Sequence, residues 1–173
     1  MKKLMVVMAV LAAATAVRAD DATLLAIRPE VVKGAKTSAV WESQNRARLA
    51  TVNDAWCATF LKGGAKAADA LLAEVKPAYY SDPFKLVQIA ALTQYCMKPG
   101  RTNDLSVWKS AVLRAAQATK DSTVAVFMLD QLRWCGSTAE IAAIRALGAK
   151  GDRAVREMAQ IVVNELSGNV IGK

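Results

Sequence analysis

The stretches NDAWCATFLKGG (residues 53–64), LTQYCMKPG (92–100) and LRWCGST (132–138) decide the fold of this chain. Each stretch contains an aromatic residue followed by a cysteine, and the three cysteines are separated by 39 residues in both intervals. Each pair closes an apolar run of helical character and is followed by turn residues and a second helical run. A fixed period of about 20–50 residues is typical of stacked repeats. The sequence therefore predicts an all-α chain built from helix–turn–helix units.

Apolar residues recur every three or four positions through these units, which is the period of one helical face. In the first unit Trp41, Asn45, Leu49, Val52, Trp56 and Phe60 recur with this period and predict one long helix that ends at Gly63-Gly64. About seven helices are expected, and no stretch alternates as a strand would. The expected segments are an irregular N-terminal arm at 20–37 and a single domain at 38–173, with repeats at about 38–77, 78–117 and 118–150 and a half repeat at 151–167 that caps the stack.

Short polar residues, glycines and prolines mark the expected helix ends. Ser137 with Glu140 three residues later forms a capping-box pattern, and Gly136 and Gly148 are expected to end helices. A last helix is expected from about Asp152 to Leu166. The other expected N-caps are Asp82 followed by Pro83, Thr102 or Asn103, and Asp121 or Ser122.

Three such units and a closing helix predict a right-handed α-solenoid, in which each unit buries its apolar face against its neighbours. The stretch GDRAVREMA at 151–159 resembles HEAT-type repeats, which often open a helix with Asp, then Val-Arg and a small residue. This resemblance covers residues 38–167. It implies a scaffold that binds other macromolecules along its concave face, and it implies no chemistry.

The resemblance also implies which surface faces inward. If the second helix of each unit lies inside, the inner surface comes from about 65–76, 103–117 and 137–149. Opposite the apolar stripes of these segments lie Lys66, Arg114 and, just past the third, Lys150. These three cations are the candidate partner-binding residues, and ordinary solvated side chains are the alternative.

The N-terminus has the pattern of an export signal. Lys2 and Lys3 precede an apolar run of 14 residues, and Val17-Arg18-Ala19 offers a cleavage site before Asp20. A retained membrane anchor is the alternative, but a span needs about 20 residues. A signal peptide at 1–19 predicts a periplasmic or extracellular protein without a membrane span in the mature chain, and its removal lowers the formal net charge from +8 to +5.

In an exported chain, two of the three cysteines could form a disulfide. However, equivalent positions on stacked helices are separated by roughly 8–10 Å, whereas the Cα atoms of a disulfide lie within about 4.4–6.8 Å. We therefore expect Cys57, Cys96 and Cys135 to be buried thiols that are not bridged to one another. One disulfide remains the alternative.

The aromatic residues of the three pairs, Trp56, Tyr95 and Trp134, are expected to form a ridge in the core. A sugar-stacking ladder is the alternative. Trp108 is likewise expected in the core.

The sequence gives little support to catalysis. The chain has no histidine, so a Ser or Cys nucleophile would need Lys or a carboxylate as its base. The 39-residue cysteine spacing does not match the short pairs that ligate zinc. Asp130 lies beside an apolar run and is expected to pair with Arg133 or Lys85. The other candidate carboxylates, expected on solvated faces, are Asp54, Asp69, Glu74 and Asp104.

These observations predict an exported, non-enzymatic interaction module of the cell envelope with no metal or cofactor. Its expected partner is another protein or an anionic envelope polymer, and not nucleic acid. The alternative is an accessory enzyme or a cofactor-handling protein on the same scaffold.

Overall fold

The computed structural model describes residues 38–75 and 84–168, and these residues form helices joined by short turns, with no strand among them. The all-α prediction is therefore confirmed for this part of the chain. The predicted signal peptide, the predicted arm at 20–37 and the predicted cap at Asp82-Pro83 lie outside the described residues. The helices are α3 (Ser38–Leu49), α4 (Asp54–Leu61), α5 (Gly64–Ala73), α6 (Phe84–Cys96), α7 (Thr102–Ala118), α8 (Ser122–Cys135), a 3-10 turn η2 (Thr138–Glu140), α9 (Ile141–Lys150) and α10 (Arg153–Leu166).

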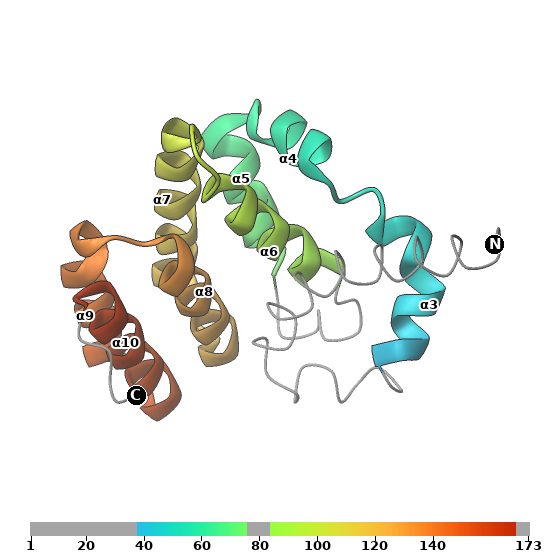
Figure 1. The fold of residues 1–173 in the computed structure, drawn as a ribbon. Helices are drawn as coiled ribbons and strands as arrows, with labels where there is room; N and C mark the ends of the chain where they lie inside the picture. Colours follow the sequence, from blue (N-terminus) through green and yellow to red (C-terminus); the bar gives the residue numbers. More distant parts are fainter. Residues whose placement is uncertain (1–37, 76–83, 169–173) are drawn as a thin grey trace, which may run out of the picture.

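The helices extend across the molecule from α3 at one end to α9 and α10 at the other (Figure 1). The main contacts join α5 to α7, α7 to α8, and α10 to both α8 and α9. Packing thus joins a helix chiefly to its next or next-but-one neighbour in the chain. Within the residues described, no helix combines the length and the apolar character needed to traverse a bilayer.

One continuous apolar core extends from α4 to α10. As predicted, Trp108 lies in it and is fully buried, and the side chains of Cys57, Cys96 and Cys135 are buried and form no disulfide. Burial raises the pKa of Cys96 to about 12, and the charges of Asp104, Cys135 and Cys57 act in the same direction.

A buried polar chain crosses this core and joins three helices. Trp108 Nε1 on α7 donates to Thr93 Oγ1 on α6 at 2.9 Å. The Thr93 hydroxyl in turn donates to Gln131 Oε1 on α8 at 2.9 Å. All three side chains are almost completely buried. Burial of polar groups costs free energy unless they are hydrogen-bonded, so this chain fixes how the three helices meet.

The first helix predicted from the sequence is wrong in its extent, because the structure breaks it into α3 and α4. Asn53 lies between them in extended backbone, and its side-chain oxygen accepts a hydrogen bond from Trp56 N at 3.0 Å. Thr51 Oγ1 donates to the Arg48 carbonyl oxygen at 2.6 Å. Short polar side chains of this kind compete with helical hydrogen bonding. The break raises the number of α-helices in the described residues to eight.

Several predicted helix ends are confirmed. Asp121 accepts hydrogen bonds from Thr123 N and Val124 N at the start of α8, and Gly136 ends that helix. Asp152 caps α10 by accepting from Val155 N at 3.0 Å.

The prediction for α7 is wrong, since its N-cap is Arg101, without a side-chain cap, and not Thr102 or Asn103. Gly100, at φ 79°, turns the chain just before it, so the helix already begins at Thr102.

Gly148 does not end its helix as predicted, because α9 continues to Lys150 and Gly151 ends it. Gly148 is instead buried against α10. A Cβ atom at this position would lie 2.7 Å from the Cβ atom of Ala159, closer than van der Waals contact allows. The glycine is therefore required for the close approach of α9 and α10.

Candidate binding groove

A groove lies between the C-terminal halves of α5 and α7 and the start of α8. Its cavity volume is about 450 Å³, which falls within the range of about 300–1,000 Å³ found for ligand sites. Buried Leu72, Val75 and Val124 contribute apolar surface to it. The other residues that line it are Asp69, Ala73, Arg114, Ala115, Ala118 and Thr119.

The helix faces explain why α5 contributes both apolar and charged groups to this groove. Ala68 and Leu72 lie four residues apart on one face of α5 and are buried, while Asp69 points to the exposed side. On α7, Ala111 and Val112 are buried, and Arg114 lies on the exposed side. The two exposed charges meet across the gap between the helices.

Arg114 and Asp69 form the only ion pair among the described residues that line the groove. Arg114 Nη2 donates to Asp69 Oδ1 at 2.8 Å, and Nε donates to the same oxygen at 3.2 Å. The two side chains are 49% and 47% exposed. Exposed pairs of this kind contribute about 0–1 kcal/mol to stability, so this pair is not required to hold α5 against α7.

The three predicted partner-binding cations lie in different surroundings. Arg114 lines the groove, and Lys66 is exposed on α5 one turn before Asp69. Lys150 is exposed at the last residue of α9 and is not among the groove-lining residues that the structure describes. The structure thus brings Arg114 together with Asp69, an acid that the sequence predicts only on a solvated face.

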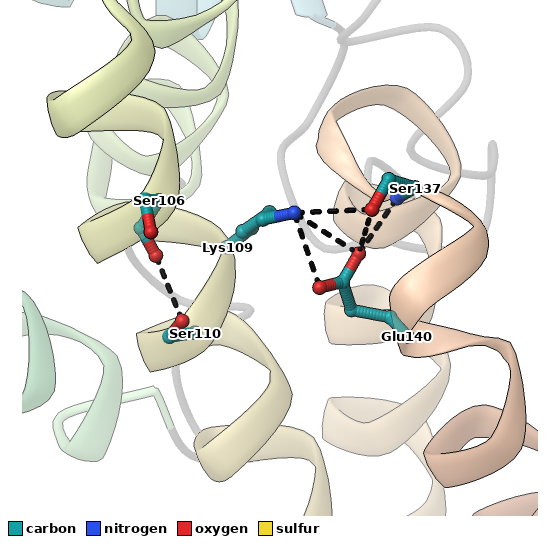
Figure 2. A network of polar contacts seen from close by, with 5 residues as sticks. All are labelled: Ser106, Lys109, Ser110, Ser137 and Glu140. Atoms are coloured by element: carbon teal, nitrogen blue, oxygen red, sulfur yellow. Dashed lines mark hydrogen bonds and ion pairs between the residues drawn. The ribbon is translucent and has the colours of Figure 1, made fainter.

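A second polar cluster joins α7 to the turn before α9 (Figure 2). Glu140 Oε2 accepts hydrogen bonds from the Ser137 backbone N and Oγ, both at 2.7 Å. This is the predicted capping box, and it is confirmed. Lys109 reaches across from α7, with its Nζ 3.1 Å from Ser137 Oγ and 3.1 Å from Glu140 Oε1. Nearby on α7, Ser110 Oγ donates to the Ser106 carbonyl oxygen at 2.8 Å.

This cluster contains the residue types that a serine–lysine nucleophile would need, but its hydrogen bonds are those of a helix cap. The Lys109 ammonium donates to both Ser137 and Glu140, so it is not a base toward the serine. The Glu140 oxygen that accepts from the Ser137 hydroxyl also accepts from the Ser137 backbone N–H, as in a helix cap. Burial of Glu140 favours its neutral form, but hydrogen bonds from Ser137 and Lys109 outweigh burial and hold the pKa of Glu140 below its ordinary value of 4.5. The arrangement fastens the start of α9 to α7.

The thiols and carboxylates give no further site within the described residues. Burial raises the pKa of Cys135, like that of Cys96, to about 12, and a nucleophile or metal ligand requires the thiolate. In the described part of the chain no three His, Cys, Asp or Glu residues are grouped so as to hold a metal ion. Asp130 pairs with Arg133 at 3.3 Å as predicted, whereas Lys85 pairs with Glu74.

The predicted aromatic ridge is only partly correct. Tyr95 is 2% exposed, and Arg101 and Lys98 cover its ring at 4.4 and 5.9 Å from the ring centroid. Trp56 is half-buried and stacks on Phe60.

Trp134, however, is 44% exposed, so its prediction as a core residue is wrong. Consecutive residues of a helix point about 100° apart. The aromatic residue that precedes a buried cysteine therefore points to a different side of its helix, and it is buried only where another helix covers that side. Together with Thr93, Gln94 and Met97, Trp134 lines a smaller cavity of about 200 Å³ between α6 and α8.

No family model, no curated protein and no solved structure matches this chain. The resemblance to HEAT-type repeats therefore rests on the residue pattern alone.

Proposed function

We propose that this chain is an exported, non-enzymatic scaffold that binds another macromolecule of the cell envelope through the groove between α5 and α7. The observation that carries the proposal is the groove itself, in which apolar surface and one weak ion pair occur together. Ligand sites generally combine apolar lining with a few placed polar groups. Arg114, selected from the sequence as a partner-binding residue, lies in this lining.

The scaffold is proposed to be a right-handed α-solenoid of about three 39-residue units closed by α10. Two observations support this architecture. Helices pack on their next and next-but-one neighbours, as stacked units do. The side chains of Cys57, Cys96 and Cys135, which recur at the repeat period, are also all buried in the same core. In this arrangement α5, α7 and α9 form the inner layer, and the groove belongs to the inner face.

The alternative of an accessory enzyme or cofactor-handling protein has less support. The cluster that most resembles a catalytic group, Lys109 with Ser137 and Glu140, has its hydrogen bonds committed to capping η2, the turn that leads into α9. The proposal therefore assigns binding and no reaction to the chain. It places the protein in the periplasm or outside the cell, on the basis of the N-terminal pattern.

The test is affinity capture from cell-envelope extract with the mature chain, residues 20–173, as bait. A variant with Lys66→Glu, Arg114→Glu and Lys150→Glu should lose the captured partner while its melting temperature stays close to that of the parent, because all three side chains are exposed. Capture should also weaken as salt is raised, since exposed charges are screened over about 8 Å at physiological ionic strength. Equal capture by parent and variant would contradict the assignment of the binding face.

A further inference from the structure

We infer that the ligand of the groove is the C-terminal end of a polypeptide, bound through an apolar last side chain and its free carboxylate. This inference rests on the proposed function and specifies the chemistry of its ligand. It follows from three features of the groove, namely the uncommitted edge of Arg114, the uncommitted oxygen of Asp69, and the apolar surface beside them.

Arg114 is only partly used by its partner. Two of the five N–H bonds of an arginine side chain are directed at Asp69, and both meet the same oxygen, Oδ1. Among the described residues, Nη1 makes no hydrogen bond. The N–H groups of Nη1 and Nη2 can therefore donate to the two oxygens of a carboxylate, in the two-point geometry that guanidinium groups favour. The side chain as a whole is 49% exposed.

Asp69 complements this edge with an acceptor. Its Oδ2 atom has no hydrogen-bond partner among the described residues, and the side chain is 47% exposed. A backbone N–H of a bound peptide can donate to Oδ2 while Oδ1 keeps its bonds to Arg114. Asp69 thus offers a hydrogen-bond acceptor and Arg114 a donor edge within the same groove.

The apolar surface lies next to these charges. Leu72, Val75 and Val124 are buried residues that line the same cavity, and Ala115 lies next to Arg114 in the chain. A C-terminal residue carries an apolar side chain, a carboxylate and an N–H on one Cα atom. An internal Asp or Glu would need a second residue to fill the apolar surface. The C-terminus therefore matches all three features with a single residue.

The experiment uses the mature chain and two pools of fluorescein-labelled octapeptides. Their last four positions are varied among Ala, Val, Leu, Ile and Phe, and one pool ends in a free carboxylate and the other in an amide. We expect the free-acid pool to bind on the order of tenfold more tightly, because a charge-assisted pair with Arg114 is present only there. Arg114→Met should abolish this difference. Arg46→Met, which changes an exposed arginine of α3 outside the groove lining, should preserve it.

Equal binding of the two pools, or no binding of either, would overturn the inference, as would an acid preference that survives Arg114→Met. Circular dichroism of both variants excludes misfolding as a cause. These outcomes are separate from failure of the proposed function. If the envelope partner is captured through the groove but neither pool binds, the scaffold role stands and the C-terminal ligand is refuted.

Discussion

Replacing Thr93 by valine should destabilise the protein strongly, although valine has nearly the same shape and is more apolar. The Thr93 hydroxyl accepts from Trp108 Nε1 and donates to Gln131 Oε1, both at 2.9 Å. The side chains of Trp108 and Gln131 are 0% exposed, so water cannot replace the lost partner. The substitution leaves two buried polar groups unsatisfied.

Each unsatisfied buried group costs about 1–3 kcal/mol, so Thr93→Val should lower the free energy of unfolding by about 2–6 kcal/mol. Thr93→Ser is the matched control. It keeps the hydroxyl and removes one methyl group, which costs about 1 kcal/mol. If apolar burial decided the outcome, the order would be reversed and valine would be the more stable variant.

The assay is urea unfolding followed by circular dichroism at 222 nm for both variants, with the slopes compared to confirm that the unfolding transition is unchanged. In a background that carries Trp108→Phe and Gln131→Met, which removes both partners, the cost of Thr93→Val should largely disappear. A valine variant as stable as the serine variant in the parent background would refute the role of this polar chain in joining α6, α7 and α8.

Four further results are expected. Trp108→Ala should cost about 3–5 kcal/mol, and Trp134→Ala only about 1 kcal/mol, because the first side chain is 0% and the second 44% exposed; comparable losses in urea unfolding would contradict these burial assignments. Gly148→Ala should destabilise, because the contact of 2.7 Å with Ala159 costs about 1–3 kcal/mol and outweighs the gain in helix propensity of about 1 kcal/mol. Adding Ala159→Gly should relieve this strain, so the double variant should be more stable than the sum of the two single losses in free energy predicts. Losses that simply add would argue against the contact. Glu140→Gln should lower the urea midpoint at pH 7 but leave it unchanged at a pH well below the lowered pKa of Glu140 in the folded protein. The ionised Glu140 stabilises the fold above its ordinary pKa of 4.5, and this stabilisation is lost as the pH falls through the folded-state pKa. The three buried thiols should react with a thiol reagent at pH 8 only when the protein unfolds, since burial holds the pKa of two of them at about 12; rapid labelling of the native protein would contradict their burial.

The parts of the fold that could be predicted from sequence are those with a local cause. Asp152 and Asp121 cap the helices that follow them, and the Ser137–Glu140 box is contained within four residues. The break between α3 and α4 was not foreseen because the apolar period continues through Val52, whereas the cap made by Asn53 decides the local backbone.

The site could be predicted only in part, because its geometry depends on packing between helices. Arg114 was selected by its place on a helix face, but its partner Asp69 lies 45 residues earlier and the pairing has no local signal. The exposure of Trp134 likewise depends on which neighbours cover one side of α8, and the 39-residue period carries no information about that.

The central claim is that a macromolecule binds in the groove between α5 and α7, and site-specific photo-crosslinking in living cells tests it most directly. A photoreactive amino acid is placed at Ala73, an exposed residue of the groove lining, and at Ala55, an exposed alanine of α4 that does not belong to that lining. The account predicts a crosslinked product of discrete mass from position 73, absent from position 55 and lost when Arg114→Glu is added. A product of equal yield from both positions, or from position 55 alone, would contradict it.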